Sequence, residues 1–237
     1  MTEEIIQEQL VSIKTCVFDA YGTLFDVAAA ARLAAEEDPQ SAFAQHWPKL
    51  AEIWRTKQLQ YTWLRAITSE HASFWDVTED GLEFALESLN LHQDDALRRR
   101  LLQLYFELQA YPEVPKMLKD LKSLGLNTAI LSNGSPDMLN GAVKSAKLEA
   151  DLDAVLSVES IGIFKPHSSV YDLVGKQFSC LKNEVLYVSS NGWDAAAASR
   201  YGFCTIWVNR AGEPLERLPW KPQNITRDLT TLPSYFK

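Results

Sequence analysis

The chain has few cysteines, no long apolar run and fewer basic than acidic side chains, and each shortage excludes a class of protein. Its 237 residues hold three cysteines, Cys16, Cys180 and Cys204, which are far apart and flanked by apolar residues. This spacing fits neither a disulfide framework nor a metal site, so we expect buried, reduced thiols in a cytoplasmic protein and no bound metal. No apolar run approaches the roughly 18 residues of a membrane-spanning helix, so no membrane association is expected.

The charge balance narrows the choice of partners. Acidic residues outnumber basic ones by 31 to 23, which gives a formal net charge of −8. Nucleic acids and anionic membranes are bound through basic surfaces, so neither is expected as a partner. The first ten residues, MTEEIIQEQL, are acidic and polar, so we do not expect a signal or transit peptide there. With 46 % hydrophobic residues, the chain is expected to fold around a packed core.

Short apolar runs alternate with helical patterns over most of the chain. Strands are expected at 14–18, 126–131, 154–158, 185–188 and 204–208. Helices are expected at 114–124, from Ser135-Pro136 onward and at 194–201, and the stretch 210–223 is expected to be a surface loop. This alternation predicts an α/β fold with a doubly wound, Rossmann-like parallel sheet.

A second pattern interrupts the first one directly after the first strand. Residues 27–110 show helical periodicity without a strand signal, at 27–37, 48–67, 80–90 and 94–109. We therefore expect an α/β core domain from 1–26 and 111–237, with 27–110 inserted as a helical cap domain.

Polar residues follow four of the predicted strands. Because ligands of open parallel sheets bind beyond the carboxyl ends of the strands, these residues are expected to meet at one edge. They are Asp19 after the first strand, Ser132 and Asn133 after the second, Lys165 after the third, and Ser189, Asn191 and Asp194 after the fourth.

These motifs resemble a known superfamily. The patterns Asp19-x-Tyr21-Gly22-Thr23-Leu24, Ser132-Asn133-Gly134, Lys165-Pro166 and Ser189-Ser190-Asn191-Gly192-Trp193-Asp194 are similar to the haloacid dehalogenase superfamily. The run IWRTKQLQYTWLR at 53–65 resembles its L-2-haloacid dehalogenase branch. The resemblance implies hydrolysis of (S)-2-haloacids and haloacetates to (R)-2-hydroxyacids through an aspartyl ester, with inversion at C2 and without a cofactor. The expected partner is a small 2-haloacid, and a second copy of the chain is a further candidate.

The resemblance also implies how the two steps are divided among the residues. Asp19 is expected to attack C2 of the substrate, and Asp194 to act as the base that activates water. Lys165 is expected to offset the repulsion between the two carboxylates. The other expected catalytic residues hold the reacting groups in place: Thr23, Ser189 and Asn191.

Substrate binding is expected to use both the core and the cap. The resemblance places the substrate carboxylate on the N–H groups of Ala20 and Tyr21 and on Ser132 and Asn133. Arg55 is expected to stabilise negative charge on the departing halogen. The remaining expected binding residues surround the alkyl group or support the site: Tyr21, Leu59, Phe74, Tyr171 and Trp193.

Other interpretations stay open at this stage. Arg55 also fits a solvated charge on a helix, Leu59 and Phe74 fit core packing, Tyr171 fits structural packing, and Thr23 fits a helix cap. A phosphatase of the same superfamily is one alternative function, although it needs an aspartate where Tyr21 stands. A catalytically silent binding protein is another. The motifs do not fix which halogen or chain length is preferred. The segment 28–48 is longer than the resemblance leads us to expect, and its length bears on access to the site.

Overall fold

A computed structural model describes residues 11–236. The expectation about the first ten residues lies outside this range. Six parallel strands form one sheet in the order β3-β2-β1-β4-β5-β6. Their bounds are Thr15–Phe18 (β1), Asn127–Ser132 (β2), Ala154–Ser157 (β3), Val185–Ser189 (β4), Cys204–Val208 (β5) and Asn224–Thr226 (β6). The predicted doubly wound sheet is confirmed, and β6 is an addition that the sequence pattern does not predict.

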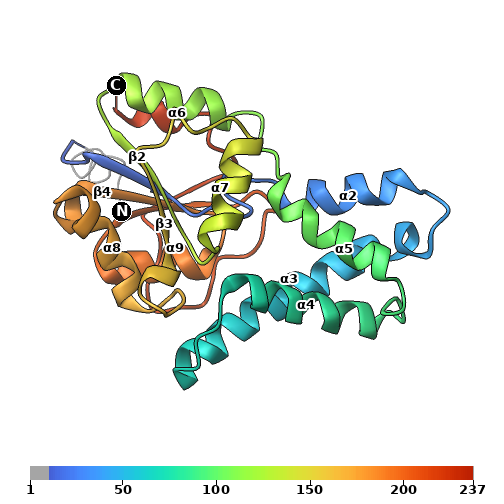
Figure 1. The fold of residues 1–237 in the computed structure, drawn as a ribbon. Helices are drawn as coiled ribbons and strands as arrows, with labels where there is room; N and C mark the ends of the chain where they lie inside the picture. The colour runs from blue at the N-terminus through green and yellow to red at the C-terminus, as the bar shows by residue number, and fades with distance from the viewer. Residues whose placement is uncertain (1–10, 237) are drawn as a thin grey trace.

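Helices cover both faces of this sheet. Figure 1 shows α6 and α7 on one face and α8 and α9 on the other. Every residue of β1, β4 and β5 is buried, as expected for central strands enclosed between two helical layers. The helices span Val114–Ser123 (α6), Pro136–Ser145 (α7), Ser168–Phe178 (α8) and Gly192–Tyr201 (α9), with 3-10 turns at Val158–Ser160, Lys182–Glu184 and Leu232–Phe236.

The helices between β1 and α6 lie to one side of the sheet (Figure 1). They span Val27–Glu37 (α2), Ala42–Thr68 (α3), Phe74–Ser88 (α4) and Asp95–Gln103 (α5), followed by a 3-10 turn at Leu104–Phe106 (η1). The longest, α3, packs side by side with α4. The helical character expected for 27–110 is therefore confirmed, and the segment 28–48 forms most of α2 and the start of α3.

Two helices begin about six residues earlier than the sequence pattern predicts, and α9 begins two residues earlier, at Gly192 rather than at 194. The expected start of α3 at Pro48 is wrong, because Ser41 caps the helix by accepting a hydrogen bond from the Ala44 N–H at 3.1 Å. Pro48 therefore lies inside the helix, beyond its first turn, where it has no N–H to donate to the preceding turn. The expected start of α4 near residue 80 is also wrong, because Ser73 and Asp76 form a capping box that begins the helix at Phe74.

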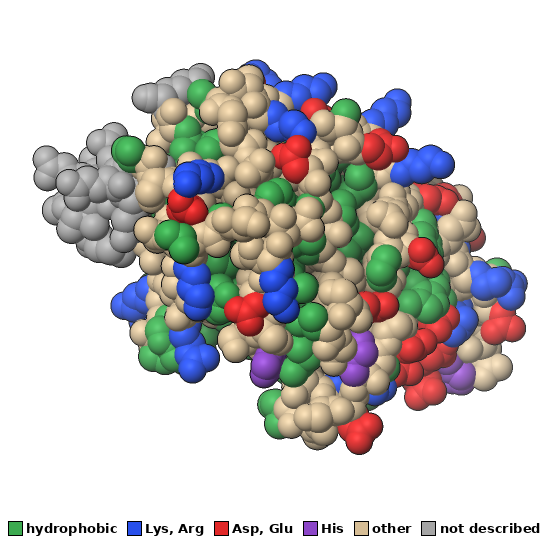
Figure 2. Space-filling model, turned by 60° about the vertical axis from the view of Figure 1, so that its left-hand side comes forward, with side chains coloured by type: hydrophobic (Ala, Val, Ile, Leu, Met, Phe, Trp, Pro, Cys, Tyr) green, Lys and Arg blue, Asp and Glu red, His purple; other side chains and the backbone are tan. Residues whose placement is uncertain are grey.

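The cysteines and the surface also bear on the expectations. Cys16 and Cys204 are buried free thiols, whereas Cys180 is only half-buried, so its expected burial is corrected. Between residues 11 and 236, no helix combines the length and the apolar character needed to cross a membrane. On the face drawn in Figure 2, Lys and Arg side chains are scattered among acidic and uncharged ones rather than joined in one basic patch.

Candidate active site

The polar residues meet at the point where the strand order of the sheet reverses. From β1 the chain proceeds to β2 and β3 on one side, then returns to β4 on the other side of β1. The carboxyl ends of β1 and β4 therefore border the crevice in which doubly wound sheets bind their ligands. Asp19 directly follows β1, and its N–H donates to the Val188 carbonyl of β4 at 2.9 Å. The expected meeting of strand ends is confirmed.

Asp19 is held by three side chains from different elements. Its carboxylate, on a side chain that is 9 % exposed, accepts from Lys165 Nζ at 3.1 Å on Oδ1 and from Asn191 Nδ2 at 3.0 Å on Oδ2. The Thr23 hydroxyl also lies 3.1 Å from Oδ2. No helix begins at Thr23, so contact with the carboxylate rather than helix capping describes its position. The tight turn between them needs Gly22, whose φ of +82° disfavours any side chain.

Lys165 lies between two carboxylates. Its ammonium, 1 % exposed, donates to Asp19, to Asp194 Oδ2 at 2.9 Å and to the Tyr187 hydroxyl at 2.5 Å. Burial alone would lower the pKa of Lys165, but the charges of Asp19 and Asp194 and the hydrogen bonds to them outweigh burial and raise it. The side chain therefore stays charged and offsets the repulsion between the carboxylates.

Asp194 is enclosed by donors that keep their protons. It is fully buried in the first turn of α9 and accepts from Tyr171 at 2.8 Å and from Tyr187 at 2.8 Å. Burial, followed by the Asp194 charge, raises the pKa of both tyrosines well above the usual value. Tyr171 therefore fits support of Asp194 better than contact with a substrate.

Tyr187 is the residue of this cluster that the sequence reasoning misses. It lies in the middle of β4, a strand that is otherwise aliphatic up to its last residue, Ser189. A single tyrosine in such a buried strand is a sequence signal that could identify it, because a buried phenol needs a hydrogen-bond partner.

Donors without protein acceptors lie beside Asp19. The N–H groups of Ala20 and Tyr21 donate to no residue between 11 and 236. Asn133 uses its Oδ1 to accept the Lys165 N–H at 2.9 Å, which turns its NH2 group away from that bond. Two hydroxyls shape the adjoining turns, because Ser132 accepts the Gly134 N–H at 3.1 Å and Ser189 accepts the Asn191 N–H at 3.1 Å. Such a set of N–H donors suits an anionic ligand.

Arg55 reaches this cluster from α3. Its guanidinium donates through NH2 to Asn191 Oδ1 at 3.2 Å and through NH1 to Gln58 Oε1 at 3.1 Å. Asn191 thus links Arg55 to Asp19, with one amide atom turned to each. The side chain is half-buried, so it is not a solvated helix charge.

Aromatic rings from the helical insertion close over the cluster. Tyr21 stacks on Phe74 with ring centroids 5.9 Å apart and meets the Tyr105 ring edge-on at 5.7 Å. Trp193 meets Trp63 of α3 edge-on at 5.3 Å. Among residues 11–236 the buried Tyr21 hydroxyl has no hydrogen-bond partner, and burial raises the pKa of this group well above its usual value.

Leu59 lies one helical turn after Arg55 and is half-buried on the same side of α3. Phe74 is 1 % exposed. The structure thus brings Arg55, Phe74, Tyr21 and Trp193 to one region. Leu59 lies on the same face of α3 as Arg55.

Metal-binding side chains do not gather anywhere in the described chain. Between residues 11 and 236, no group of three or more His, Cys, Asp or Glu side chains is arranged to hold a metal ion.

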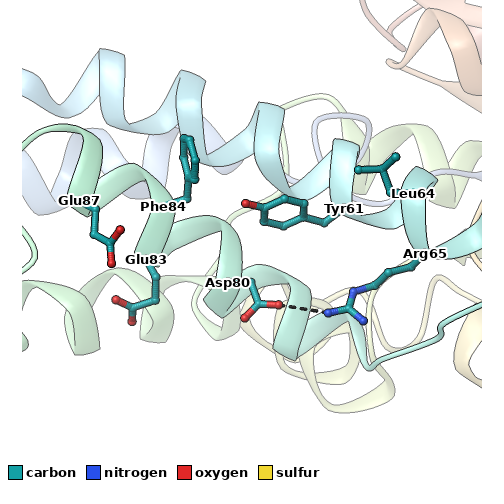
Figure 3. Close-up of a pocket in the computed structure, with 7 residues that line it drawn as sticks. All are labelled: Tyr61, Leu64, Arg65, Asp80, Glu83, Phe84 and Glu87. Atoms are coloured by element: carbon teal, nitrogen blue, oxygen red, sulfur yellow. Dashed lines mark hydrogen bonds and ion pairs between the residues drawn. The ribbon is translucent and has the colours of Figure 1, made fainter. Parts of the chain in front are cut away.

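A groove of about 400 Å³ lies away from this cluster, between α3 and α4. Figure 3 shows acidic side chains of α4 along one wall and Arg65 paired with Asp80 at 3.3 Å. Its lining residues are Tyr61, Leu64, Arg65, Asp80, Glu83, Phe84 and Glu87. None of the residues predicted for catalysis or substrate binding is among them.

Known proteins match this chain over most of its length. A family model described as haloacid dehalogenase-like hydrolase matches residues 13–202. The (S)-2-haloacid dehalogenase 4A of Burkholderia cepacia is 42 % identical over 205 residues, 86 % of this chain and 87 % of the relative. The (S)-2-haloacid dehalogenase of Pseudomonas fluorescens is 37 % identical over 95 % of this chain and 97 % of the relative.

A solved structure agrees with the sequence matches. The L-2-haloacid dehalogenase of Xanthobacter autotrophicus with chloropropionic acid covalently bound superposes with a TM-score of 0.85 at 35 % identity, over 94 % of this chain and 97 % of that one. The chain belongs to the haloacid dehalogenase-like hydrolases, in the family of the (S)-2-haloacid dehalogenases.

Proposed function

We infer that the chain is a hydrolytic dehalogenase that converts (S)-2-haloacids and haloacetates to (R)-2-hydroxyacids and halide. The observation that carries this is one amide, Asn191, which donates to the Asp19 carboxylate at 3.0 Å and accepts from the Arg55 guanidinium at 3.2 Å. A nucleophile and a cation thereby face the same small space. The Xanthobacter autotrophicus relative, with chloropropionic acid covalently bound, supports a covalent route.

In the first step, Asp19 attacks C2 of the substrate from the side opposite the halogen. A C–O bond forms, the carbon–halogen bond breaks, and the halide departs with the bonding electrons, so C2 inverts. Hydrogen bonds from Lys165 and Asn191 orient the attacking carboxylate. Halide departure needs no proton, which suits a site where Tyr21 occupies the position of the acid used by related phosphatases.

The substrate is held as an anion beside Asp19. We assign its carboxylate to the N–H groups of Ala20 and Tyr21, with Ser132 and Asn133 at the neighbouring strand end. Arg55 faces the halogen and stabilises the charge that develops on it. The apolar walls around the alkyl group are assigned to Tyr21, Leu59, Phe74 and Trp193.

In the second step, water attacks the carbonyl carbon of the Asp19 ester. We assign Asp194 as the base, because its carboxylate shares the Lys165 ammonium with Asp19. A carboxylate accepts about four hydrogen bonds, and the three donated by Lys165, Tyr171 and Tyr187 leave one acceptor position for a water. Thr23, Ser189 and Asn191 hold the turns around the reacting groups.

Halide release tests the assignment against both alternatives. The purified chain should release chloride from (S)-2-chloropropionate in the presence of EDTA, form (R)-lactate, and release no phosphate from p-nitrophenyl phosphate. Asp19→Asn should fold normally and release no chloride, because the amide is isosteric but not nucleophilic. Phosphate release would favour a phosphatase, absence of both activities a binding protein, and racemic or retained product would contradict the single inversion.

We further propose that the cap and the core act as separate domains, 27–110 and the remainder of the chain. Two hydrogen bonds pair the connecting segments, from the Asp26 N–H to the Gln109 carbonyl at 2.9 Å and from the Tyr111 N–H to the Leu24 carbonyl at 3.0 Å. Because the two connecting segments are paired in this way, movement of the cap relative to the core would bend the backbone at these two adjacent segments. Hydrogen exchange should show residues 27–110 opening as a unit with a lower free energy than the sheet.

A homodimer through the groove of Figure 3 is the assembly we propose. Leu64 and Phe84 in that groove are 57 % and 40 % exposed, and Ile67, three residues after Leu64 on α3, is 79 % exposed. Burying such side chains against a second copy would stabilise the pair. Sedimentation should give a dimer for the parent chain and a monomer for Phe84→Glu; a monomeric parent chain would contradict this.

A cytoplasmic location is proposed from the free thiols of Cys16, Cys180 and Cys204, since reduced cysteines persist in that compartment. Fractionation of cells that express the chain naturally tests this, and recovery from a secreted fraction would contradict it.

A further inference from the structure

Gln58 is a fully buried amide whose hydrogen bonds lead to Arg55. It lies on α3, three residues after Arg55, and is 0 % exposed. Its Oε1 accepts from Arg55 NH1 at 3.1 Å. Its Nε2 donates to the Thr78 hydroxyl at 2.8 Å and to the Tyr105 hydroxyl at 3.2 Å. A buried amide needs hydrogen-bond partners, and these partners also determine which way the Gln58 amide points.

Thr78 fixes which way the amide points. The Thr78 hydroxyl has one proton, and it donates that proton to the Phe74 carbonyl at 2.7 Å within α4. Towards Gln58 the hydroxyl can therefore only accept, so the NH2 group of Gln58 must face Thr78. The carbonyl oxygen of Gln58 is then turned to Arg55, where it accepts the hydrogen bond from NH1.

This orientation extends to the nucleophile. With NH1 held by Gln58, the guanidinium plane is fixed and NH2 reaches Asn191 Oδ1 at 3.2 Å. Asn191 in turn directs its NH2 group to Asp19 at 3.0 Å. Rotation of the Gln58 amide by half a turn would place its NH2 group against Arg55 and break this series of hydrogen bonds at its first member.

We propose that Gln58, oriented by Thr78 and Tyr105, is a positioning residue that holds the Arg55 guanidinium toward the departing halide. The proposal rests on the proposed dehalogenase function. It extends the machinery further into the helical insertion, because Thr78 lies on α4 and Tyr105 on the turn η1. A group displaced by about 1 Å from the transition state loses rate on the order of a hundredfold.

The test is the rate of halide release in a single turnover, measured with 2-chloro-, 2-bromo- and 2-iodopropionate. Gln58→Met keeps the length of the side chain and removes its hydrogen bonds. The rate should fall on the order of ten- to a hundredfold with little change in substrate affinity. The loss of rate should be largest for the chloro substrate, because chloride is the poorest leaving group of the three and depends most on charge stabilisation. It should be smallest for the iodo substrate.

Three further variants separate positioning from packing. Thr78→Val frees the amide to turn and should repeat the halogen-dependent loss, whereas Thr78→Ser keeps the hydroxyl and should restore most of the rate. The matched control is Thr62→Val, since Thr62 is also buried on α3 and its hydroxyl donates to the Leu59 carbonyl at 2.7 Å, in a bond that does not involve Arg55. In an Arg55→Ala background, Gln58→Met should cause little additional loss.

The outcomes are distinguishable. Halide release by the parent chain with unchanged rates in Gln58→Met, or an equal loss for all three halogens, overturns the role of Gln58 and leaves the dehalogenase function standing. An equal loss in Thr62→Val assigns the effect to packing and also overturns it. If Gln58→Met does not fold, the Thr78 pair decides by the same criteria. No halide release by the parent chain overturns both proposals.

Discussion

Lys165 brings one positive charge to two carboxylates in a site with little access to water. Its side chain is 1 % exposed, and those of Asp19 and Asp194 are 9 % and 0 % exposed. At this depth, the attraction between the ammonium and its partners is balanced against the cost of removing all three from water. The arrangement therefore depends on each member, and loss of one leaves the others uncompensated.

Lys165→Met should abolish halide release and lower the free energy of unfolding by about 3–5 kcal/mol, the usual cost of leaving a buried charge unpaired. Urea unfolding with far-ultraviolet circular dichroism measures the loss. Lys122→Met is the matched control, because Lys122 pairs with Asp153 at 2.7 Å with both side chains 33 % exposed, and such pairs contribute about 1 kcal/mol or less. A similar small loss in both variants would contradict the account.

The residues that the sequence predicts well are those whose chemical type is unusual at a strand end. Asp19, Lys165 and Asp194 were predicted to meet, and their hydrogen bonds join them. Tyr187 and Gln58 could not be predicted in the same way. Tyrosine in a strand and glutamine in a helix are ordinary residues, and only their contacts across elements distinguish them.

Among the elements, the short turn after β2 determines how closely Tyr21 approaches the sheet edge. A Cβ at Gly134 would lie 2.8 Å from the Tyr21 hydroxyl oxygen and 3.0 Å from a methyl group of Leu139. Real contacts of this kind are not that short, so the absence of a side chain at Gly134 makes room for the ring. The Tyr21 ring then stacks on Phe74 of α4, which ties this turn to the helical cap.

Gly134→Ala should displace the Tyr21 ring, lower the rate of halide release and cost about 1–3 kcal/mol of stability, as overpacking does. Halide release and urea unfolding measure the two effects. In Gly175→Ala, the control, the added methyl group meets its nearest neighbour at 3.5 Å inside α8, so activity should not change. Full activity of Gly134→Ala would show that the ring position is not critical.

The starts of the helices show where local sequence signals predict the structure and where apolar periodicity misses them. Ser135-Pro136 correctly predicts the start of α7, as a cap residue followed by proline. The capping box at Ser73 and Asp76 carries an equally local signal for α4, which apolar periodicity alone passes over. The start of α8 has no such signal, since its cap is His167, a residue that rarely caps helices.

At the scale of the whole molecule, the cap and the core meet through hydrogen bonds and ring contacts around a shared site. The Phe74 N–H at the start of α4 donates to Glu159 at 2.9 Å, and Arg55 donates to Asn191. Alternation of strands and helices predicts the sheet and the inserted block from the sequence. The way the two pack together does not follow from periodicity, because it depends on side chains far apart in the chain.

Buried tyrosines and Lys165 should make the folded state sensitive to alkaline pH. The pKa of Tyr21, Tyr171 and Tyr187 lies well above the usual 10.0, and that of Lys165 above 10.5. Their stabilising contribution is complete below these usual values. As the pH rises further, the unfolded chain loses protons first and stability falls until the folded groups also titrate.

Urea unfolding across the alkaline range should therefore show a free energy of unfolding that falls above about pH 10. Tyr187→Phe should fall less steeply, because one raised pKa is removed. Tyrosinate absorbance should show these phenols ionising together with unfolding. Stability that stays constant through this range, or an identical slope in Tyr187→Phe, would contradict the burial and pairing described for the site.

A single turnover in ¹⁸O-labelled water with enzyme in excess tests most directly whether Asp19 forms the covalent ester. If water opens the ester at its carbonyl, the label should appear in the peptide that contains Asp19 and be missing from the hydroxy acid. Asp194→Asn should slow this opening, so that alkylated enzyme accumulates as a mass increase on the same peptide. Label in the hydroxy acid on the first turnover would mean that water attacks C2 directly, and would contradict the account.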